Sequence, residues 1–378
     1  MVGAHFCICA PWALIFDILN GGKWMAEMIR VAVDAMGGDN APGEIIRGAA
    51  EALRRQSRLD VTLVGQEEVI RKELSALPDL PQERLHIHPA SEVIAMAEPP
   101  VQAITKKKDS SIVQGMMLVR HGECDAFVTA GSSGATLVGG QLLIGRIKGI
   151  ERAPFAPVLP TKRGPVLLID CGANVDARAS ELVQWGQMGS IYMESILGVR
   201  NPRVALANIG AEDDKGNALV KETMPLMKAL TDIHFTGSVE ARDIPYGGAD
   251  VVVCDAFTGN MLLKMYEGTA HMLQEEISDA IRHGGPLALL GGLMVKPALK
   301  KTLTKFSVRT YGGAPMLGLN GLVVKAHGNA DAVVFAHAVE QCVEWKDKRI
   351  NDQFREKMKL VDRTVKKAQT TSADGAEV

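Results

Sequence analysis

Lys215 lies in a loop whose composition suits anion binding. Residues 203–217 read RVALANIGAEDDKGN, so the apolar run at 204–206 leads into a Gly-containing, acid-rich loop, and a helical pattern begins at Gly216. The first turn of such a helix has unpaired backbone N–H groups and a partial positive charge, to which Lys215 adds a full charge. Three neighbouring acids oppose this interpretation, so they must point away, hold Lys215 in position or bind a cation: Glu212, Asp213 and Asp214.

Two serines form a second candidate anion site. Residues 125–130 (DAFVTA) predict a strand, and GSSGATLVGG follows at 131–140. Ser132 and Ser133, between glycines at a helix start, can hold an anion through hydroxyl and backbone N–H donors. Simple capping of the helix is the alternative. A nucleophile elbow centred on Ser133 is excluded, because its spacing requires glycine where the chain has Ala135.

A third polar loop follows the first predicted strand. Residues 29–34 (IRVAVD) form a β-branched run, and AMGGDNAP then leads into a helical pattern at 43–55. Gly37 and Gly38 permit a positive φ or a close approach of ligand, although a plain tight turn fits equally well. The loop lacks the G-x-G-x-x-G spacing, so a dinucleotide fingerprint is absent.

The strands that hold these loops predict the fold class. At least five apolar strands end in loops rich in Gly, Asn, Asp or Ser that open helices, which is the doubly wound α/β arrangement. We expect a single α/β domain over residues 28–367. Residues 1–27 are apolar but lack the basic start of a signal peptide, so we expect an extension outside the fold. Residues 368–378 predict a flexible tail.

Composition excludes several classes of function. The chain of 378 residues has a net charge of −2 and no long run of one sign, which argues against a nucleic-acid surface. The H-E-x-x-H zinc motif and the Walker loop are both missing. Four of the six cysteines lie in or beside apolar segments and predict buried, reduced thiols; they are Cys124, Cys171, Cys254 and Cys342.

Residues 283–305 combine an apolar centre with basic ends. Ten consecutive apolar or Gly residues, 286–295, are flanked by Arg282 and by four lysines. Ten residues are too few to span a bilayer of about 30 Å. The pattern favours a peripheral membrane contact, through modest insertion and attraction to anionic lipid. A buried helical hairpin or a dimer contact fits the pattern equally well.

Eight motifs, taken in order, resemble one known family. They are VAVDAMGGDNAP, TAGSSGAT, IDCGANVD, GAEDDKGN, FTGSVEARD, CDAFTGN, YGGAPMLGL and VVKAHGNAD, and they span about residues 29–344. Their order and spacing closely resemble the PlsX family of phosphate acyltransferases. The resemblance implies transfer of a fatty acyl group from acyl carrier protein to inorganic phosphate, for phospholipid synthesis. It also implies an αβα sandwich of the isopropylmalate dehydrogenase and phosphotransacetylase type, with a protruding helical hairpin.

The resemblance also implies roles for individual residues. Lys215 would steady phosphate or the thioester carbonyl oxygen, and Asn260 would hydrogen-bond the tetrahedral intermediate, without a covalent enzyme intermediate. Ser132 and Ser133 would bind phosphate. The remaining residues that would line the site are Asp34, Gly37, Gly38 and Asn174. The apolar tip that would reach the membrane comprises Leu287, Leu289, Leu290, Leu293 and Met294.

The resemblance further implies a cytoplasmic homodimer that associates peripherally with the membrane and with the downstream glycerol-phosphate acyltransferase. No cofactor and no metal are expected. Two alternatives remain at this stage. One is a metal-dependent dehydrogenase of the same fold class, with the acids at 212–214 as metal ligands. The other is a non-catalytic membrane organiser.

Overall fold

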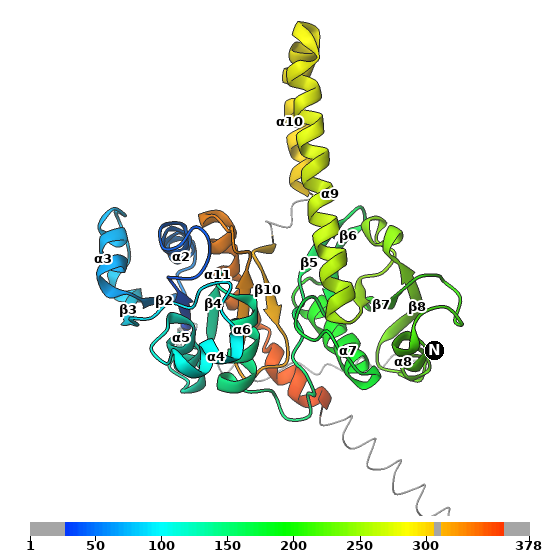
Figure 1. Ribbon diagram of the computed structural model, residues 1–378, viewed down its shortest axis with the longest axis horizontal. Helices are drawn as coiled ribbons and strands as arrows, with labels where there is room; N and C mark the ends of the chain where they lie inside the picture. Colours follow the sequence, from blue (N-terminus) through cyan, green and yellow to red (C-terminus); the bar gives the residue numbers. More distant parts are fainter. Residues whose placement is uncertain (1–26, 306–310, 359–378) are drawn as a thin grey trace, which may run out of the picture.

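The computed structural model describes residues 27–305 and 311–358. Apart from Glu27, the predicted N-terminal extension therefore lies outside the described residues, as do the predicted tail and residues 359–367 of the predicted domain. The described chain forms two sheets, one of six strands and one of five. Figure 1 shows them side by side, each with its own covering helices.

The first sheet is parallel except at one edge. Its order is β10 (Gly313–Met316), β11 (Leu322–Ala326), β4 (Ala126–Thr129), β1 (Ile29–Asp34), β2 (Leu59–Gly65) and β3 (Leu85–Pro89). Only β10 runs antiparallel to its neighbour. A short 3₁₀ turn, η1 (Gln82–Arg84), precedes β3.

Helices cover both faces of this sheet. One face packs against α2 (Gly43–Arg55) and α11 (Ala332–Asp347), and the other against α4 (Pro100–Lys106), α5 (Ser111–Arg120) and α6 (Ser133–Gly139), which continues as the π-helical η2 (Gly140–Ile144). Helix α3 (Glu67–Ser75) lies at the edge near β3 (Figure 1). Side chains alternate between the faces: Val31 and Val33 enter one core cluster and Ala32 the other, as a strand period of two requires. Both faces are apolar because both are covered.

The second sheet follows the same plan. Its order is β5 (Val158–Thr161), β6 (Gly164–Ile169), β9 (Val251–Val253), β7 (Arg203–Asn208) and β8 (His234–Glu240), with only β5 antiparallel. Helices α7 (Ala179–Ser195) and α8 (Ala218–Lys228) cover one face. The other face packs against η3 (Ala241–Tyr246) and the start of a long helix, α9.

The two sheets share one core. The largest hydrophobic cluster contains Val33 of the first sheet together with Leu167 and Val251 of the second. An isolated bridge from Phe155, which precedes β5, to Met316 of β10 also joins the two halves. The predicted fold class, a doubly wound αβα sandwich, is confirmed, but its division into two sheets was not predicted.

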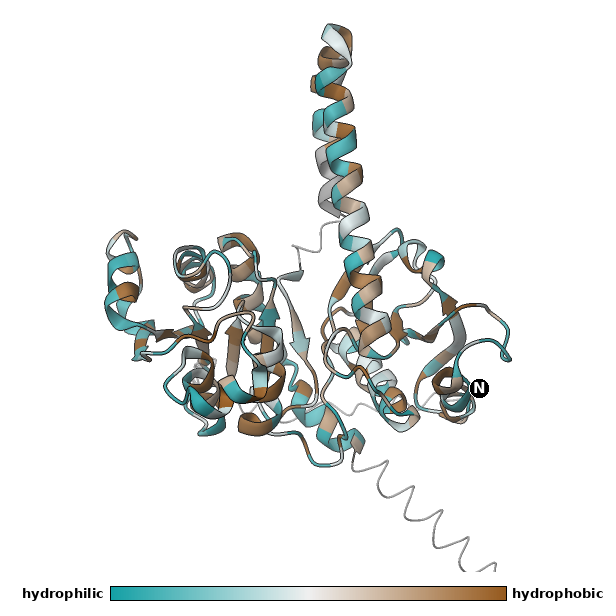
Figure 2. Cartoon of the chain, viewed as in Figure 1, coloured by the Kyte–Doolittle hydropathy of each residue, from teal (hydrophilic) through white to brown (hydrophobic). Residues whose placement is uncertain are grey.

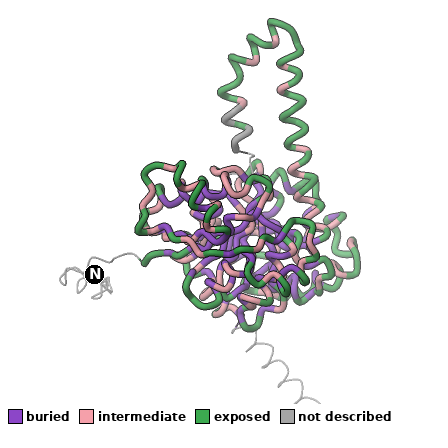
Figure 3. Tube along the Cα trace, turned by 60° about the vertical axis from the view of Figure 1, so that its left-hand side comes forward, coloured by how far each residue is buried: buried purple, intermediate pink, exposed green. Residues whose placement is uncertain are grey.

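A helical hairpin projects from the second sheet. Helix α9 (Ala256–His283) and helix α10 (Gly285–Lys305) rise well clear of both sheets (Figures 1 and 3). Within α9, only Ala256 and Gly259 are buried. The apolar residues at the tip are exposed, by 85% for Leu287 and 77% for Met294, and Figure 2 shows apolar residues along the projecting part. The alternative of a hairpin buried within this chain is therefore wrong. None of the described helices is long and apolar enough to cross a bilayer.

Strand β10, at residues 313–316, forms where the local sequence does not favour a strand. Gly313, Ala314 and Pro315 have little intrinsic strand preference. Pairing with β11 supplies the stability instead, and Pro315 is tolerated because β10 is an edge strand.

Candidate active site

The first group of predicted site residues lies at the carboxyl ends of β1 and β4, between which the strand order of the first sheet reverses. Strands β1 and β4 are neighbours: the strand that follows β1 in the chain, β2, lies on one side of this pair, and β11, which the chain reaches only after the second sheet, lies on the other. Ligands of open α/β sheets bind at the carboxyl ends of strands at such a switch point. The turn after β11 closes the same edge, since the Asp39 N–H donates to the Gly328 carbonyl at 2.8 Å and the Asn40 Nδ2 to the Asn329 carbonyl at 3.0 Å.

Asp34 is the buried carboxylate of this group. Its side chain is fully buried, and its Oδ2 accepts the Thr129 hydroxyl at 2.6 Å while Oδ1 accepts the Met36 N–H at 3.2 Å. Burial raises the pKa of Asp34 above its ordinary value; hydrogen bonds from Ser111, Thr129 and Met36 and the charge of Lys325 oppose this rise. Asp34 is therefore turned into the protein, toward β4.

Gly37 and Gly38 allow these loops to approach closely. A Cβ on Gly37 would lie 2.1 Å from Asp34 Oδ2 and 2.8 Å from the Gly131 nitrogen. Gly38 has φ +112°, and a Cβ there would lie 2.9 Å from the Ala130 Cβ. The lack of a side chain at both positions therefore lets the loop after β1 pack against the loop after β4.

Removing the hydroxyl that supports Asp34 tests this packing. In Thr129→Val, a buried carboxylate oxygen loses its 2.6 Å donor. We expect the free energy of unfolding to fall by about 1–3 kcal/mol, measured by urea denaturation. Thr105→Val is the matched control, because the Thr105 hydroxyl donates only to exposed carbonyls of its own helix, those of Val101 and Gln102. Equal stability of the two variants would contradict the role given to Thr129.

Ser132 and Ser133 differ in environment. Ser132 is buried, and its Oγ accepts the Ala135 N–H at 3.3 Å, which is a helix cap. Ser133 is exposed. The capping alternative for Ser132 is therefore confirmed in part, since its O–H remains able to donate while its oxygen accepts.

The second group lies at the carboxyl ends of β6, β9 and β7, which are adjacent and parallel. Asn174 follows β6, Asn260 follows β9 and Lys215 follows β7. The Asn174 carbonyl accepts the Ala256 N–H at 3.0 Å. A Cβ on Gly259 would lie 2.0 Å from the Asp170 carbonyl oxygen. The loop that holds Asn174 and the start of α9, which holds Asn260, are therefore in direct contact.

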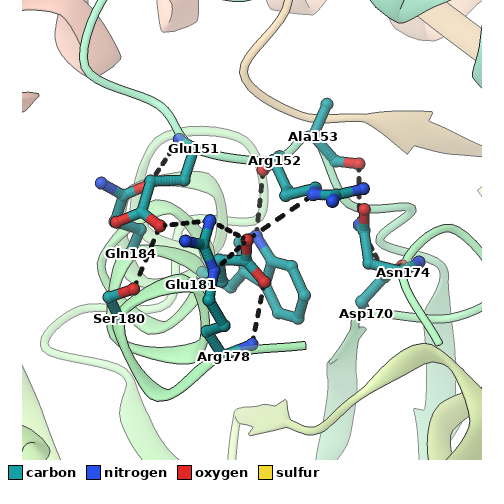
Figure 4. A network of polar contacts seen from close by, with 10 residues as sticks. Glu151, Arg152, Ala153, Asp170, Asn174, Arg178, Ser180, Glu181 and Gln184 are labelled. Carbon is teal, nitrogen blue, oxygen red and sulfur yellow. Dashed lines mark hydrogen bonds and ion pairs between the residues drawn. The ribbon is translucent and has the colours of Figure 1, made fainter. Parts of the chain in front are cut away.

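Asp170 orients Asn174 (Figure 4). The Asn174 Nδ2 donates to Asp170 Oδ2 at 2.7 Å and to the Ala153 carbonyl at 3.1 Å, while Asp170 Oδ1 accepts the Phe155 N–H at 2.9 Å. Burial raises the pKa of Asp170 to about 6 despite these donors. Since Phe155 also pairs with Met316 of β10, Asp170 and Asn174 lie at the seam between the two sheets.

The loop of Lys215 is exposed and held by its backbone. The Lys215 N–H donates to the Glu212 carbonyl at 3.2 Å, and the Lys215 carbonyl accepts Asn208 Nδ2 at 3.3 Å. Asp213 forms an ion pair with Lys228 of α8. The carboxylate of Asp213 therefore pairs with α8 and not with Lys215; it holds the loop in place, as we expect of these acids, without contacting the Lys215 ammonium.

Sequence reasoning missed Lys325. It lies on β11 opposite Thr129, and its Nζ donates to the Ala130 carbonyl at 3.1 Å. Burial lowers the pKa of Lys325 to about 8, an effect that Asp34 and Asp39 oppose. The available signal was a lysine in an otherwise apolar strand, LVVKA, directly before a polar turn.

Comparison with known proteins identifies the family. A family model described as "Fatty acid synthesis protein" matches residues 29–353. A phosphate acyltransferase from Clostridium beijerinckii is 43% identical over 327 residues, which cover 86% of this chain and 98% of that protein. The chain belongs to the phosphate acyltransferase family. A phosphate acyltransferase from Clostridium acetobutylicum is likewise 43% identical, over 86% of this chain and 97% of its own.

Solved structures agree with this family at the level of fold. A phosphotransacetylase from Streptococcus pyogenes superposes with a TM-score of 0.55 at 18% identity, over 89% of this chain and 99% of its own. A branched-chain phosphotransacylase from Enterococcus faecalis gives a TM-score of 0.51 at 16% identity, over 84% and 98%. Membership of the phosphate acyltransferase family favours the acyltransferase prediction over both alternatives, the dehydrogenase and the non-catalytic organiser.

The cysteines beside the site of this phosphate acyltransferase family member are poor nucleophiles. The thiols predicted to be buried and reduced are confirmed as free and buried. Burial raises the pKa of both Cys171 and Cys254 well above the ordinary value for a thiol, and nucleophilic attack requires the thiolate. Within residues 27–305 and 311–358, no group of three or more His, Cys, Asp or Glu side chains is placed to hold a metal ion.

Proposed function

We propose that this chain transfers a fatty acyl group from acyl carrier protein to inorganic phosphate, giving acyl phosphate for phospholipid synthesis. Membership of the phosphate acyltransferase family supports acyl transfer to phosphate. The observation that carries the proposal is the 43% identity to a phosphate acyltransferase over 98% of that protein's length. Acyl carrier protein as the donor and phospholipid synthesis as the role are the more specific parts of the proposal.

The proposed reaction is a direct displacement at the thioester. A phosphate oxygen attacks the carbonyl carbon and forms the C–O bond, which gives a tetrahedral intermediate; this intermediate then collapses as the C–S bond breaks. The carrier-protein thiolate leaves and takes up a proton. Holding both reactants in one site removes much of the entropic cost, and the high pKa of the neighbouring thiols supports a path without an acyl-enzyme.

In this proposal the two groups of residues have different roles. Ser132 and Ser133 bind phosphate at the first sheet, beside Asp34, Gly37 and Gly38. At the second sheet, Lys215 and Asn260 stabilise negative charge, on phosphate or on the carbonyl oxygen, with Asn174 lining the site. Donors fixed before the reaction are effective because they need no reorganisation as the charge develops.

The surroundings proposed for this reaction are those of a peripheral membrane protein. We propose a homodimer in the cytoplasm whose exposed tips contact the membrane and bring the product to the downstream glycerol-phosphate acyltransferase. The exposure of Leu287, Leu290 and Met294 supports this contact, because an apolar tip gains free energy when it leaves water.

The reaction itself is tested by thiol release. Purified protein is incubated with long-chain acyl carrier protein, with and without inorganic phosphate, and free carrier-protein thiol and acyl phosphate are measured. We expect both products only when phosphate is present. Thiol release at the same rate without phosphate would indicate a hydrolase. A requirement for a nicotinamide cofactor and loss of activity with a chelator would instead support the dehydrogenase.

Introducing negative charge at the tip by substitution tests the proposed membrane contact. The double variant Leu289→Glu, Leu293→Glu is expected to lose most co-sedimentation with vesicles that contain anionic lipid, since each carboxylate would have to be desolvated. The control Val101→Glu, Leu226→Glu adds the same charge at exposed positions on α4 and α8 and should bind like the wild type. Binding of the tip variant at the wild-type level would contradict the proposed membrane contact of the tip.

A further inference from the structure

Lys325 is placed where three neighbouring strands end. It lies one residue before the end of β11, in register with Thr129 of β4. Its Nζ donates to the carbonyls of Ala130, at 3.1 Å, and Ala326. Ala130 directly precedes the loop of Ser132 and Ser133, so this ammonium fixes the backbone from which both hydroxyls extend.

Among residues 27–305 and 311–358, the ammonium of Lys325 has no anion in hydrogen-bond contact. Its contacts are carbonyl oxygens, and in the part of the chain that the structure describes it forms no ion pair with a carboxylate. Asp34 acts on it only from a distance, because the oxygens of Asp34 accept the Thr129 hydroxyl and the Met36 N–H. Partial burial of a cation without a paired anion has a desolvation cost, so an anion that arrives beside Lys325 gains more than it would at a solvated lysine.

The two lysines of the site stand in different surroundings. Lys215 is exposed and belongs to the second sheet, beyond β7. Lys325 is partly buried and belongs to the first sheet, beside the serine loop. One of the two cations is therefore solvated, and the other is partly desolvated.

We propose that Lys325 is the cation that binds inorganic phosphate at the serine loop, which leaves Lys215 to act on the thioester carbonyl. This inference rests on the proposed function. It also decides which group Lys215 acts on, the carbonyl oxygen and not phosphate. A phosphate oxygen takes the remaining N–H of the ammonium, while the Ser132 and Ser133 hydroxyls donate to the same anion. Charge-assisted bonds of this kind are the strong ones in a protein interior.

Steady-state kinetics with the full-length protein test the assignment. We expect Lys325→Gln to raise the KM for phosphate about tenfold or more and to leave the KM for acyl carrier protein within about twofold. Lys325→Arg should restore most phosphate affinity, because it retains the charge. The control is Lys346→Gln, a lysine that pairs with Asp125 at the opposite end of β4, which should behave like the wild type.

A second measurement separates binding from folding. Phosphate should raise the Tm of the wild type and of Lys325→Arg, whereas folded Lys325→Gln should show little shift, because a ligand stabilises only a state that binds it. If Lys325→Gln does not fold, Lys325→Arg still tests the assignment through its pH profile. Burial lowers the pKa of Lys325 to about 8, so kcat/KM for phosphate should fall in the wild type as pH rises through that value.

Arginine stays protonated throughout this range, so Lys325→Arg should lack this fall. The ionisations of phosphate and of acyl carrier protein affect both enzymes alike, so they do not account for a difference between the two pH profiles. The titratable groups that influence Lys325 are Asp34 of β1 and Asp39 of the following loop, and both favour its protonated form. An unchanged phosphate KM in folded Lys325→Gln, or the same alkaline fall in Lys325→Arg, would overturn the inference. Absence of phosphate-dependent thiol release by the wild type would instead overturn the proposed function.

Discussion

Replacing Lys215 with alanine is expected to lower kcat by about 10²–10³, the usual loss when one preorganised donor to a developing charge is removed. The fold should be unaffected, because the side chain of Lys215 is exposed and its loop is held through the backbone, by the Glu212 carbonyl and Asn208 Nδ2. The measurement is phosphate-dependent thiol release at saturating phosphate and acyl carrier protein. The KM for phosphate should change little, since we assign phosphate binding to Lys325.

Lys228→Ala provides the matched control for Lys215→Ala. Lys228 is a second lysine of the same region, and it pairs with Asp213 of the acidic loop. Its removal frees Asp213 without touching the group assigned to catalysis, so kcat should stay within about twofold of wild type, as expected for an exposed ion pair. Wild-type activity in folded Lys215→Ala would refute the proposed mechanism. Equal losses in both variants would mean that the loop, and not the ammonium of Lys215, is what matters.

Gly259→Ala should damage both stability and activity. An added Cβ would lie 2.0 Å from the Asp170 carbonyl oxygen and 3.1 Å from Cys254 Sγ, so the first turn of α9 must move away from the end of β6. Overpacking of this kind costs about 1–3 kcal/mol, and the displacement includes Asn260, the next residue. Because misplacement by about 1 Å can cost about 10²-fold in rate, we expect kcat to fall by at least that factor.

Gly268→Ala distinguishes this steric effect from helix propensity. Gly268 lies in the same helix, and a Cβ there meets nothing within 4 Å. Alanine should therefore stabilise that variant by about 0.5–1 kcal/mol and leave kcat unchanged. Urea denaturation and thiol release measure the two quantities. If Gly259→Ala remains as stable and as active as Gly268→Ala, the close contact between α9 and β6 is not required.

Regular alternation and clear helix signals made much of the fold predictable. Residues 29–34 and 43–55 were predicted with the bounds that the structure gives to β1 and α2. Each combines a β-branched or amphipathic pattern with a polar or Pro-containing boundary, so local preference and tertiary packing agree. The loops after β1 and β4 were predicted as site loops for the same reason, because Gly and Ser mark the ends of those strands.

Features that depend on neighbours in space were not predictable from the local pattern. The strand at Gly313–Met316 owes its form to β11, and Asp213 pairs with a lysine that lies 15 residues further along the chain. Lys325 lies in a segment that reads as an ordinary strand, and its role depends on Ala130, 195 residues away. Such contacts are long-range consequences of the fold, which a single sequence without its topology does not reveal.

The long helix α9 connects the candidate active site to the projecting tip. Its base is held by the close contact at Gly259 and, two turns later, by the Tyr266 hydroxyl, which donates to the Pro160 carbonyl. His283 lies 17 residues beyond Tyr266, which is about 26 Å of α-helix. A bend of about 5° just beyond Tyr266 would therefore move the tip by about 2 Å without displacing Asn260, the residue proposed to hydrogen-bond the intermediate.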